Sequence, residues 1–141
     1  MPYCTLADLT ARISEASLIQ LSDEQGQGLV DTAKTDSAIA RAGQEIDTWC
    51  GSRYQVPFAD PPAILAALAA ELAIYYLYGR TQDEIPETWR DAHKNALALL
   101  RAIAEGKVSL GEAPQAEAPA AAGPRVSAPG RVIDRDRLSG F

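Results

Sequence analysis

The residues that could do acid–base, nucleophilic or metal chemistry are few and scattered along the chain. His93 is the single histidine, and Cys4 and Cys50 are the two cysteines. A metal site needs several such side chains at a fixed spacing, and no such cluster occurs here. No glycine pattern of the phosphate-binding or dinucleotide-binding kind occurs either. The sequence therefore predicts neither a metal nor a cofactor.

One catalytic arrangement can still be written down, with Cys50 as nucleophile, His93 as base and an aspartate to orient the base. No local signature supports it. Trp89 shares a helix face with His93, and Cys50 falls on the apolar face of another helix, so core packing is favoured for both. We therefore expect a protein that is not an enzyme, with a cysteine hydrolase as the weaker alternative.

Glu71 stands out because it lies in the middle of the most apolar stretch. A buried carboxylate needs a partner, which Arg53 or Arg12 could supply. We expect a salt bridge in the core in preference to a catalytic acid. Three tyrosines follow at 75, 76 and 78, and they serve either core packing or a contact surface for a neighbouring subunit.

Composition and charge narrow the class of protein. The chain has 141 residues, with 13 lysines and arginines against 19 aspartates and glutamates, a net charge of −6. The length fits one domain. Binding to phosphate backbones rests on lysine and arginine, so free nucleic acid is not an expected partner. The cysteines are expected to be reduced thiols in the cytosol. The apolar run from Pro61 to Tyr78 is marginal in length for a bilayer, and we expect a buried helix and no membrane.

The spacing of apolar residues predicts an all-α fold, a small bundle of about four helices around a central apolar helix. The first helix begins after Thr5, with Asp8 completing a capping box, and runs to about residue 15. A further apolar patch at 18–21 precedes a turn. The next helix spans about 29–50.

The predicted central helix runs from Pro62 to Tyr78 and is apolar nearly all round, which is typical of a buried helix. Gly79 is its expected C-cap. The last helix follows Pro86 and ends at Gly106. These helices would form the core that positions everything else.

The composition changes near Gly111, where the chain becomes rich in proline and alanine. Such a segment buries too little apolar surface to offset its ordering entropy. We divide the chain into a helical core (1–111), a Pro/Ala-rich linker (112–129) and a long extended C-terminal interaction arm (130–141).

Arginine–valine pairs repeat at a spacing of six near the end of the chain, so an extended segment places both pairs on matching sides. The end is also more apolar than a solubilising tail requires. The residues expected to bind a partner are Arg125, Val126, Arg131, Val132, Ile133, Arg135, Arg137, Leu138 and Phe141.

Four stretches carry a resemblance to a known family, namely 3–9, 42–57, the alanine-rich helix from Pro61 to Arg80, and 97–110. In their order and spacing they resemble the small helical neck proteins of tailed phages and prophages, in particular those of Mu-like phages. That family is similar to the head–tail connector, or head-completion adaptor, proteins. The resemblance covers about 3–111. Its motif residues are Thr5, Asp8, Leu9, Ile46, Trp49, Arg53, Tyr54, Pro57, Glu71 and Tyr75.

The resemblance implies a structural adaptor in the neck of the virion, assembled in the host cytoplasm. Such adaptors form a ring, commonly of twelve copies, beneath the portal, where the ring extends the DNA channel between head and tail. The implied partners are the portal protein, the next neck or tail-completion protein and further copies of the chain. Genomic DNA would pass through the lumen without specific binding. The C-terminal arm would anchor each subunit to a neighbouring protein, the portal first.

A different class of protein remains as the alternative. A small helical binding module or regulator could use the same tail to fold on a host or phage partner. It would form a one-to-one complex and no ring.

Overall fold

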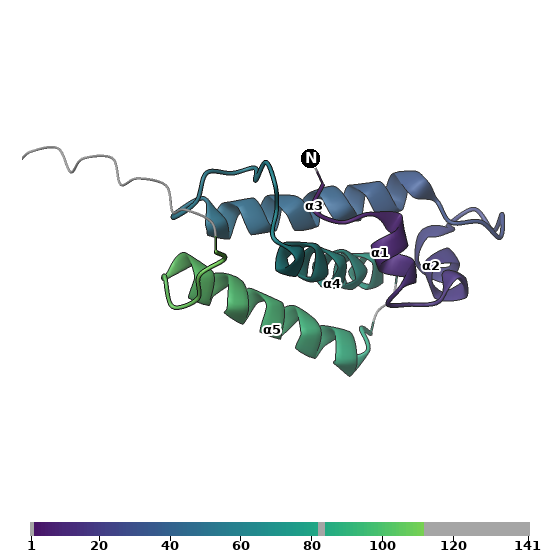
Figure 1. Cartoon of the computed structure of the whole chain (residues 1–141). Helices are drawn as coiled ribbons and strands as arrows, with labels where there is room; N and C mark the ends of the chain where they lie inside the picture. The colour runs from purple at the N-terminus through teal and green to yellow at the C-terminus, as the bar shows by residue number, and fades with distance from the viewer. Residues whose placement is uncertain (1, 82–83, 112–141) are drawn as a thin grey trace, which may run out of the picture.

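The computed structural model describes residues 2–81 and 84–111. Within these residues the chain forms five α-helices and no strand: α1 (Leu6–Thr10), α2 (Glu15–Ser22), α3 (Thr32–Cys50), α4 (Ala63–Thr81) and α5 (Glu87–Ala104). Figure 1 shows three long helices, α3, α4 and α5, with the short α1 and α2 packed to one side. The predicted all-α class is confirmed. The linker (112–129) and the C-terminal arm (130–141) lie outside the described residues.

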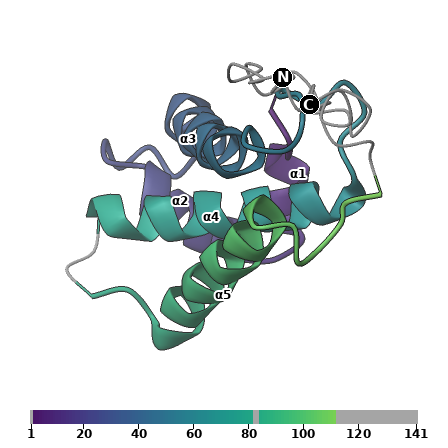
Figure 2. The same cartoon turned by 90° about the vertical axis from the view of Figure 1, so that its left-hand side faces the viewer.

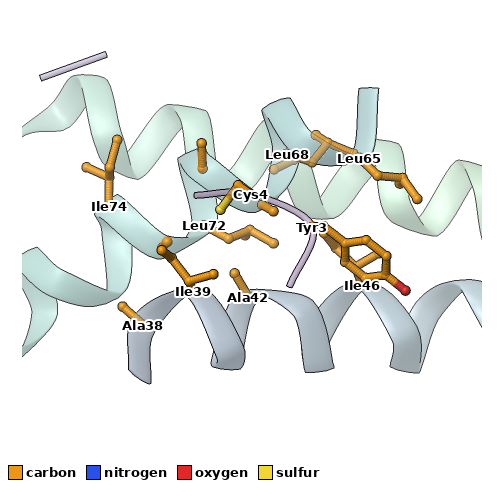
Figure 3. Close-up of a cluster of buried hydrophobic side chains, with 14 of the residues drawn as sticks. Tyr3, Cys4, Ala38, Ile39, Ala42, Ile46, Leu65, Leu68, Leu72 and Ile74 are labelled. Carbon is orange, nitrogen blue, oxygen red and sulfur yellow. The ribbon is translucent and has the colours of Figure 1, made fainter. Parts of the chain in front are cut away.

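Helix α4 is the central helix, as its apolar sequence predicts. It contacts α1, α2, α3 and α5. Its length and composition alone would let it cross a membrane, but its place at the centre of the bundle accounts for its apolar residues. Figure 3 shows how α3 and α4 meet, with Tyr3 and Cys4 beside them, through Ala38, Ile39, Ala42, Ile46, Leu65, Leu68, Leu72 and Ile74.

The N-terminal region forms two helices, and the single helix predicted to reach about residue 15 is wrong. The capping box is present, because the Asp8 carboxylate accepts a hydrogen bond from the Thr5 backbone N–H at 2.7 Å. Helix α1 ends at Thr10. Ser14 then starts α2, because its hydroxyl accepts a hydrogen bond from the Ser17 N–H at 3.2 Å. A serine that caps a new helix competes with continuation of the old one. The fold therefore has one helix more than the sequence pattern predicts.

The ends of α3 and α4 also differ from prediction. Helix α3 begins at 32, three residues later than predicted, because the Asp31 side chain caps it by accepting from the Ala33 N–H at 3.0 Å. Helix α4 runs through Gly79 to Thr81, so the predicted C-cap at Gly79 is wrong. A Cβ at Gly79 would lie 3.9 Å from the Ile85 side chain. This glycine therefore lies under the segment that leads to α5.

The predicted end of α5 at Gly106 is confirmed. The Gly106 N–H donates to the Ile103 carbonyl at 3.1 Å, and the Lys107 N–H donates to the Ala102 carbonyl at 2.9 Å. This pair of bonds is a Schellman motif, and Gly106 takes the positive φ of 80° that the motif requires. The motif turns the chain sharply, which sets the direction in which 107–111 leave the helix.

Candidate assembly interface

Tyr3 fastens the N-terminal segment to α3 and to the connector before α4. Its side chain is 6% exposed. Its hydroxyl donates a hydrogen bond to the Asp47 carboxylate and accepts one from the Phe58 N–H at 3.2 Å. The Tyr3 and Phe58 rings meet edge to face, with centroids 6.1 Å apart. Burial, followed by the hydrogen bond to Asp47, raises the pKa of Tyr3 to about 12.

Tyr54 holds the point at which the chain leaves the core. It is buried against Phe58, with ring centroids 5.7 Å apart, and its hydroxyl accepts a hydrogen bond from the Leu110 N–H at 3.2 Å. Figure 2 shows the chain after α5 running beside the connector that joins α3 to α4. The segment that follows Gly111 therefore starts from a fixed place, beside the connector before α4.

Arg53 packs against the end of α5. A Cβ added at Gly106 would lie 1.5 Å from Arg53 Nη1, so the guanidinium occupies the space that this glycine leaves open. Of the two arginines considered as partners for Glu71, Arg53 is therefore not the one that pairs with it. Arg53 and Tyr54 together clamp the two ends of the segment 106–110.

Glu71 pairs with Arg12, the other predicted partner, at 3.2 Å between Arg12 Nη1 and Glu71 Oε1. The prediction that this bridge lies in the core is wrong, because the two side chains are 33% and 28% exposed. Helix α4 buries its apolar side chains on the other faces and leaves Glu71 near the end of α1. The pair therefore links α1 to α4 at the edge of the bundle.

The other motif residues contribute to packing and to local hydrogen bonds. Trp49 is half buried, and its ring N–H donates to Glu45 Oε1 at 3.0 Å. The peptide bond between Val56 and Pro57 is cis. The fully buried members of the set are Leu9 and Ile46.

The three tyrosines of α4 build an aromatic layer between α4 and its neighbours. Tyr75 stacks on His93 of α5 with ring centroids 3.8 Å apart, and the Arg41 guanidinium lies 4.0 Å from the centre of the Tyr76 ring. Tyr78 stacks on Trp89. Core packing is confirmed for Tyr76, which is buried. A subunit contact through the half-buried Tyr75 and Tyr78 stays a prediction.

The groups proposed for a hydrolase are unsuited to that chemistry. Cys50 is buried, and burial raises its pKa to about 11, so it is a neutral thiol at pH 7. A nucleophilic cysteine needs a lowered pKa. Burial also lowers the pKa of His93, which makes its imidazole a weaker base. Within 2–81 and 84–111 no three histidine, cysteine, aspartate or glutamate side chains are placed to hold a metal ion.

A hollow of about 600 Å³ lies between the N-terminal segment and α3. The first wall comes from 2–6 and includes the apolar side chains of Cys4 and Leu6. The second wall comes from α3 and mixes apolar with polar residues, namely Ile39, Ala40 and Gly43 with Asp36, Gln44 and Asp47. Tyr3 and Asp47 hold the two walls at a fixed separation. Sequence reasoning missed this hollow and its supports Tyr3, Asp47 and Phe58, because they pair across long stretches of chain.

The predicted binding residues near the C-terminus lie outside the described residues. They are Arg125, Val126, Arg131, Val132, Ile133, Arg135, Arg137, Leu138 and Phe141. The structure describes the place from which their segment departs, and that place is the Tyr54–Leu110 contact.

The fold and the surfaces described above define a small all-helical protein built around one apolar helix. Residues 3–128 match the family described as Bacteriophage Mu, Gp36, and the chain belongs to that family. The resemblance to Mu-like phage proteins is thus confirmed. The match runs beyond the expected limit at 111 and takes in nearly all of the linker.

Two relatives place the chain among phage and prophage proteins. The Haemophilus influenzae protein named "Mu-like prophage FluMu protein gp36" is 30% identical over 82 residues, which are 58% of this chain and 56% of that protein. The Escherichia phage Mu protein named "Gene product J" is 29% identical over 113 residues, which are 79% of this chain and 77% of that protein. The aligned region therefore spans little more than half of the Haemophilus protein.

Proposed function

We propose that this protein is a structural adaptor in the neck of a Mu-like phage. In this proposal several copies form a ring beneath the portal, connect the DNA-filled head to the tail and extend the DNA channel. The observation that carries the proposal is the family match over 3–128, since it assigns both the helical core and the linker to a phage protein. Virion location, ring and portal contact are parts of the proposal.

The charge of the core suits a channel through which DNA passes. Residues 1–111 contain nine lysines and arginines against fifteen aspartates and glutamates. Like charge keeps phosphates from being captured by a surface, so DNA can slide past it. Binding without sequence preference would instead need clustered lysine and arginine.

The fixed exit of the chain suits an anchoring role for the C-terminal arm. Tyr54 holds Leu110, so each arm starts from the same point on its subunit. Repeated around a ring, weak contacts made by each arm add up through effective concentration. The apolar residues Leu138 and Phe141 would gain burial on a neighbouring protein, with the portal as the expected one.

Co-expression of the full chain with the portal protein of the same phage tests the proposal. We expect one complex whose mass, measured by native mass spectrometry, corresponds to a ring of this chain on a portal ring. A chain truncated after Gly111 should keep its helical circular dichroism and lose the portal. A chain of full length with the residues of 112–124 in shuffled order is the matched control and should still bind.

The possible results separate the candidate functions. A one-to-one complex with a single partner chain would replace the adaptor with the binding-module alternative. Undiminished portal binding by the truncated chain would remove the anchoring role of the arm while leaving the ring intact.

A further inference from the structure

We propose that the hollow between the N-terminal segment and α3 seats the arginine–valine segment, residues 125–133, of a second copy of the chain. The inference rests on the proposed function because it assumes that copies of the chain assemble into a ring. A contact between a segment of one copy and a different surface of the next is head-to-tail, and such contacts close into rings when the rotation permits.

The two walls of the hollow differ in chemistry. The N-terminal wall includes Cys4 and Leu6 and carries no charge, whereas the α3 wall has the carboxylates of Asp36 and Asp47 on either side of an apolar stretch, Ile39, Ala40 and Gly43. Asp36 is exposed, and Asp47 is half buried through its bond to Tyr3. The best occupant is therefore a segment that is apolar on one side and cationic on the other.

Residues 125–133 have this two-sided pattern. Side chains alternate sides along an extended chain, so Arg125 and Arg131 share one side while Val126 and Val132 share the other. In the hollow, the valines would face the N-terminal wall and the arginines would face α3. The peptide would thus match both walls at once.

The spacing of the charged groups also fits. Asp36 and Asp47 are eleven residues apart on one helix, which is about 16 Å along its axis. Arg125 and Arg131 are six residues apart, which is about 20 Å in an extended chain. Arginine side chains are long and flexible enough to take up the difference.

Net charge favours the same pairing. The segment 125–141 carries four arginines against two aspartates, whereas 1–111 carries a clear excess of acidic residues. Opposite charge raises the rate of encounter and selects the register of binding. The apolar Leu138 and Phe141 lie beyond the seated segment, which leaves them available for the portal.

The linker favours a second copy over the hollow of the same copy. Prolines recur at 114, 119 and 124, and proline-rich linkers are stiff spacers of about 3 Å per residue. A stiff spacer of thirteen residues, the length of 112–124, would reach about 40 Å. A core of about 110 residues has a radius of gyration of about 13 Å, so this reach exceeds its width. A linker of this kind would carry 125–133 beyond its own subunit.

Paramagnetic relaxation between two populations of the full chain tests the inference. One population carries a nitroxide at Ser127→Cys, and the other is labelled with ¹⁵N and carries no nitroxide. Both native thiols are buried, so the label attaches at position 127. We expect broadening of the Ala40 and Gln44 amide signals in the ¹⁵N copies, and weaker broadening in high salt, which screens the charge pairs.

Two exposed alanines make a matched pair of variants. Ala40→Arg fills the hollow and repels the arginines, and it should lower the affinity at least ten-fold, as the loss of broadening measures. Ala98→Arg places the same side chain at an exposed position of α5, away from the hollow beside α3, and should change nothing. Both alanines lie on helix surfaces, and circular dichroism checks that each variant folds.

Two results would overturn the inference: no broadening between copies, or broadening that Ala40→Arg leaves unchanged. Portal binding, measured as described above, is scored separately. A chain whose arm binds the portal without visiting the hollow would contradict this inference and leave the adaptor function standing.

Discussion

Tyr3 and Asp47 share a hydrogen bond although 44 residues separate them in the sequence. The bond joins the N-terminal segment to α3, and the Phe58 N–H adds the connector before α4 to the same hydroxyl. Tyr3 therefore supports both walls of the hollow that we assign to a second copy. Loss of the Tyr3 hydroxyl should lower the free energy of unfolding. It should also weaken the binding of a second copy in the hollow.

The variant Tyr3→Phe removes this hydroxyl and keeps the ring. The free energy of unfolding should fall by about 1–3 kcal/mol, because the Asp47 carboxylate and the Phe58 N–H lose a partner in a largely buried place. Urea unfolding followed by circular dichroism measures the change. Asp47→Ala supplies the control, since Tyr3→Phe should cost less in that background. Equal costs in both backgrounds would show that the two residues are not coupled.

Alkaline pH should destabilise the fold through three buried groups. Burial raises the pKa of Tyr3 from 10.0 to about 12, and those of Cys4 and Cys50 from 9.0 to about 11. The folded state holds these protons more tightly than the unfolded state. Their contribution to stability is therefore complete below the unfolded pKa values and is lost as pH rises through the folded ones.

The free energy of unfolding should accordingly decline between about pH 9 and pH 12. Denaturant titrations at successive pH values measure the decline. Tyr3→Phe should show a shallower decline above about pH 10, because it lacks one of the three groups. A stability that is constant across this range would contradict the burial that we describe.

Gly106→Ala should destabilise the protein by more than Gly28→Ala. Both glycines have positive φ, 80° and 72°, so alanine is strained at either site by about 1–2 kcal/mol. Open space surrounds Gly28, whereas a Cβ at Gly106 would displace the Arg53 guanidinium. Thermal or urea unfolding of the two variants measures the difference. In an Arg53→Ala background the two costs should become equal, and a persistent gap would mean that Arg53 does not fill this space.

Glu71→Gln should have a small effect, at most about 1 kcal/mol, because exposed ion pairs contribute little. The pair with Arg12 is about a third exposed on each side. A bridge in the core would behave differently, since removing one partner of a buried pair costs about 3–5 kcal/mol. Unfolding measurements at low and high salt distinguish the two cases, and a loss in the larger range would show that the pair is buried.

The parts of the fold that sequence reasoning predicts are those with local causes. The apolar face of α4, the capping box at Thr5 and the glycine turn at Gly106 each depend on residues within a few positions of one another. The division between α1 and α2 was missed because nothing in the apolar spacing distinguishes Ser14 from other polar residues. Only the structure shows that its hydroxyl caps α2.

The parts that sequence reasoning misses depend on pairing across the chain. Arg12 and Arg53 are equally plausible partners for Glu71 until the fold sets one at the end of α1 and the other beside Gly106. Nothing local marks Tyr3 and Asp47 as a pair either. The resemblance did bring their stretches, 3–9 and 42–57, together as motifs.

We propose above all that copies of this protein form a ring in the phage neck. Labelled particles test this proposal most directly. A small tag inserted at Gln27 suits this purpose, since open space surrounds Gly26 and Gly28 on either side. Electron cryomicroscopy of purified particles should then show tag density around a ring between portal and tail, and the five-helix core should fit the ring. Tag density at another place in the particle, or particles that carry none of this protein, would contradict the account.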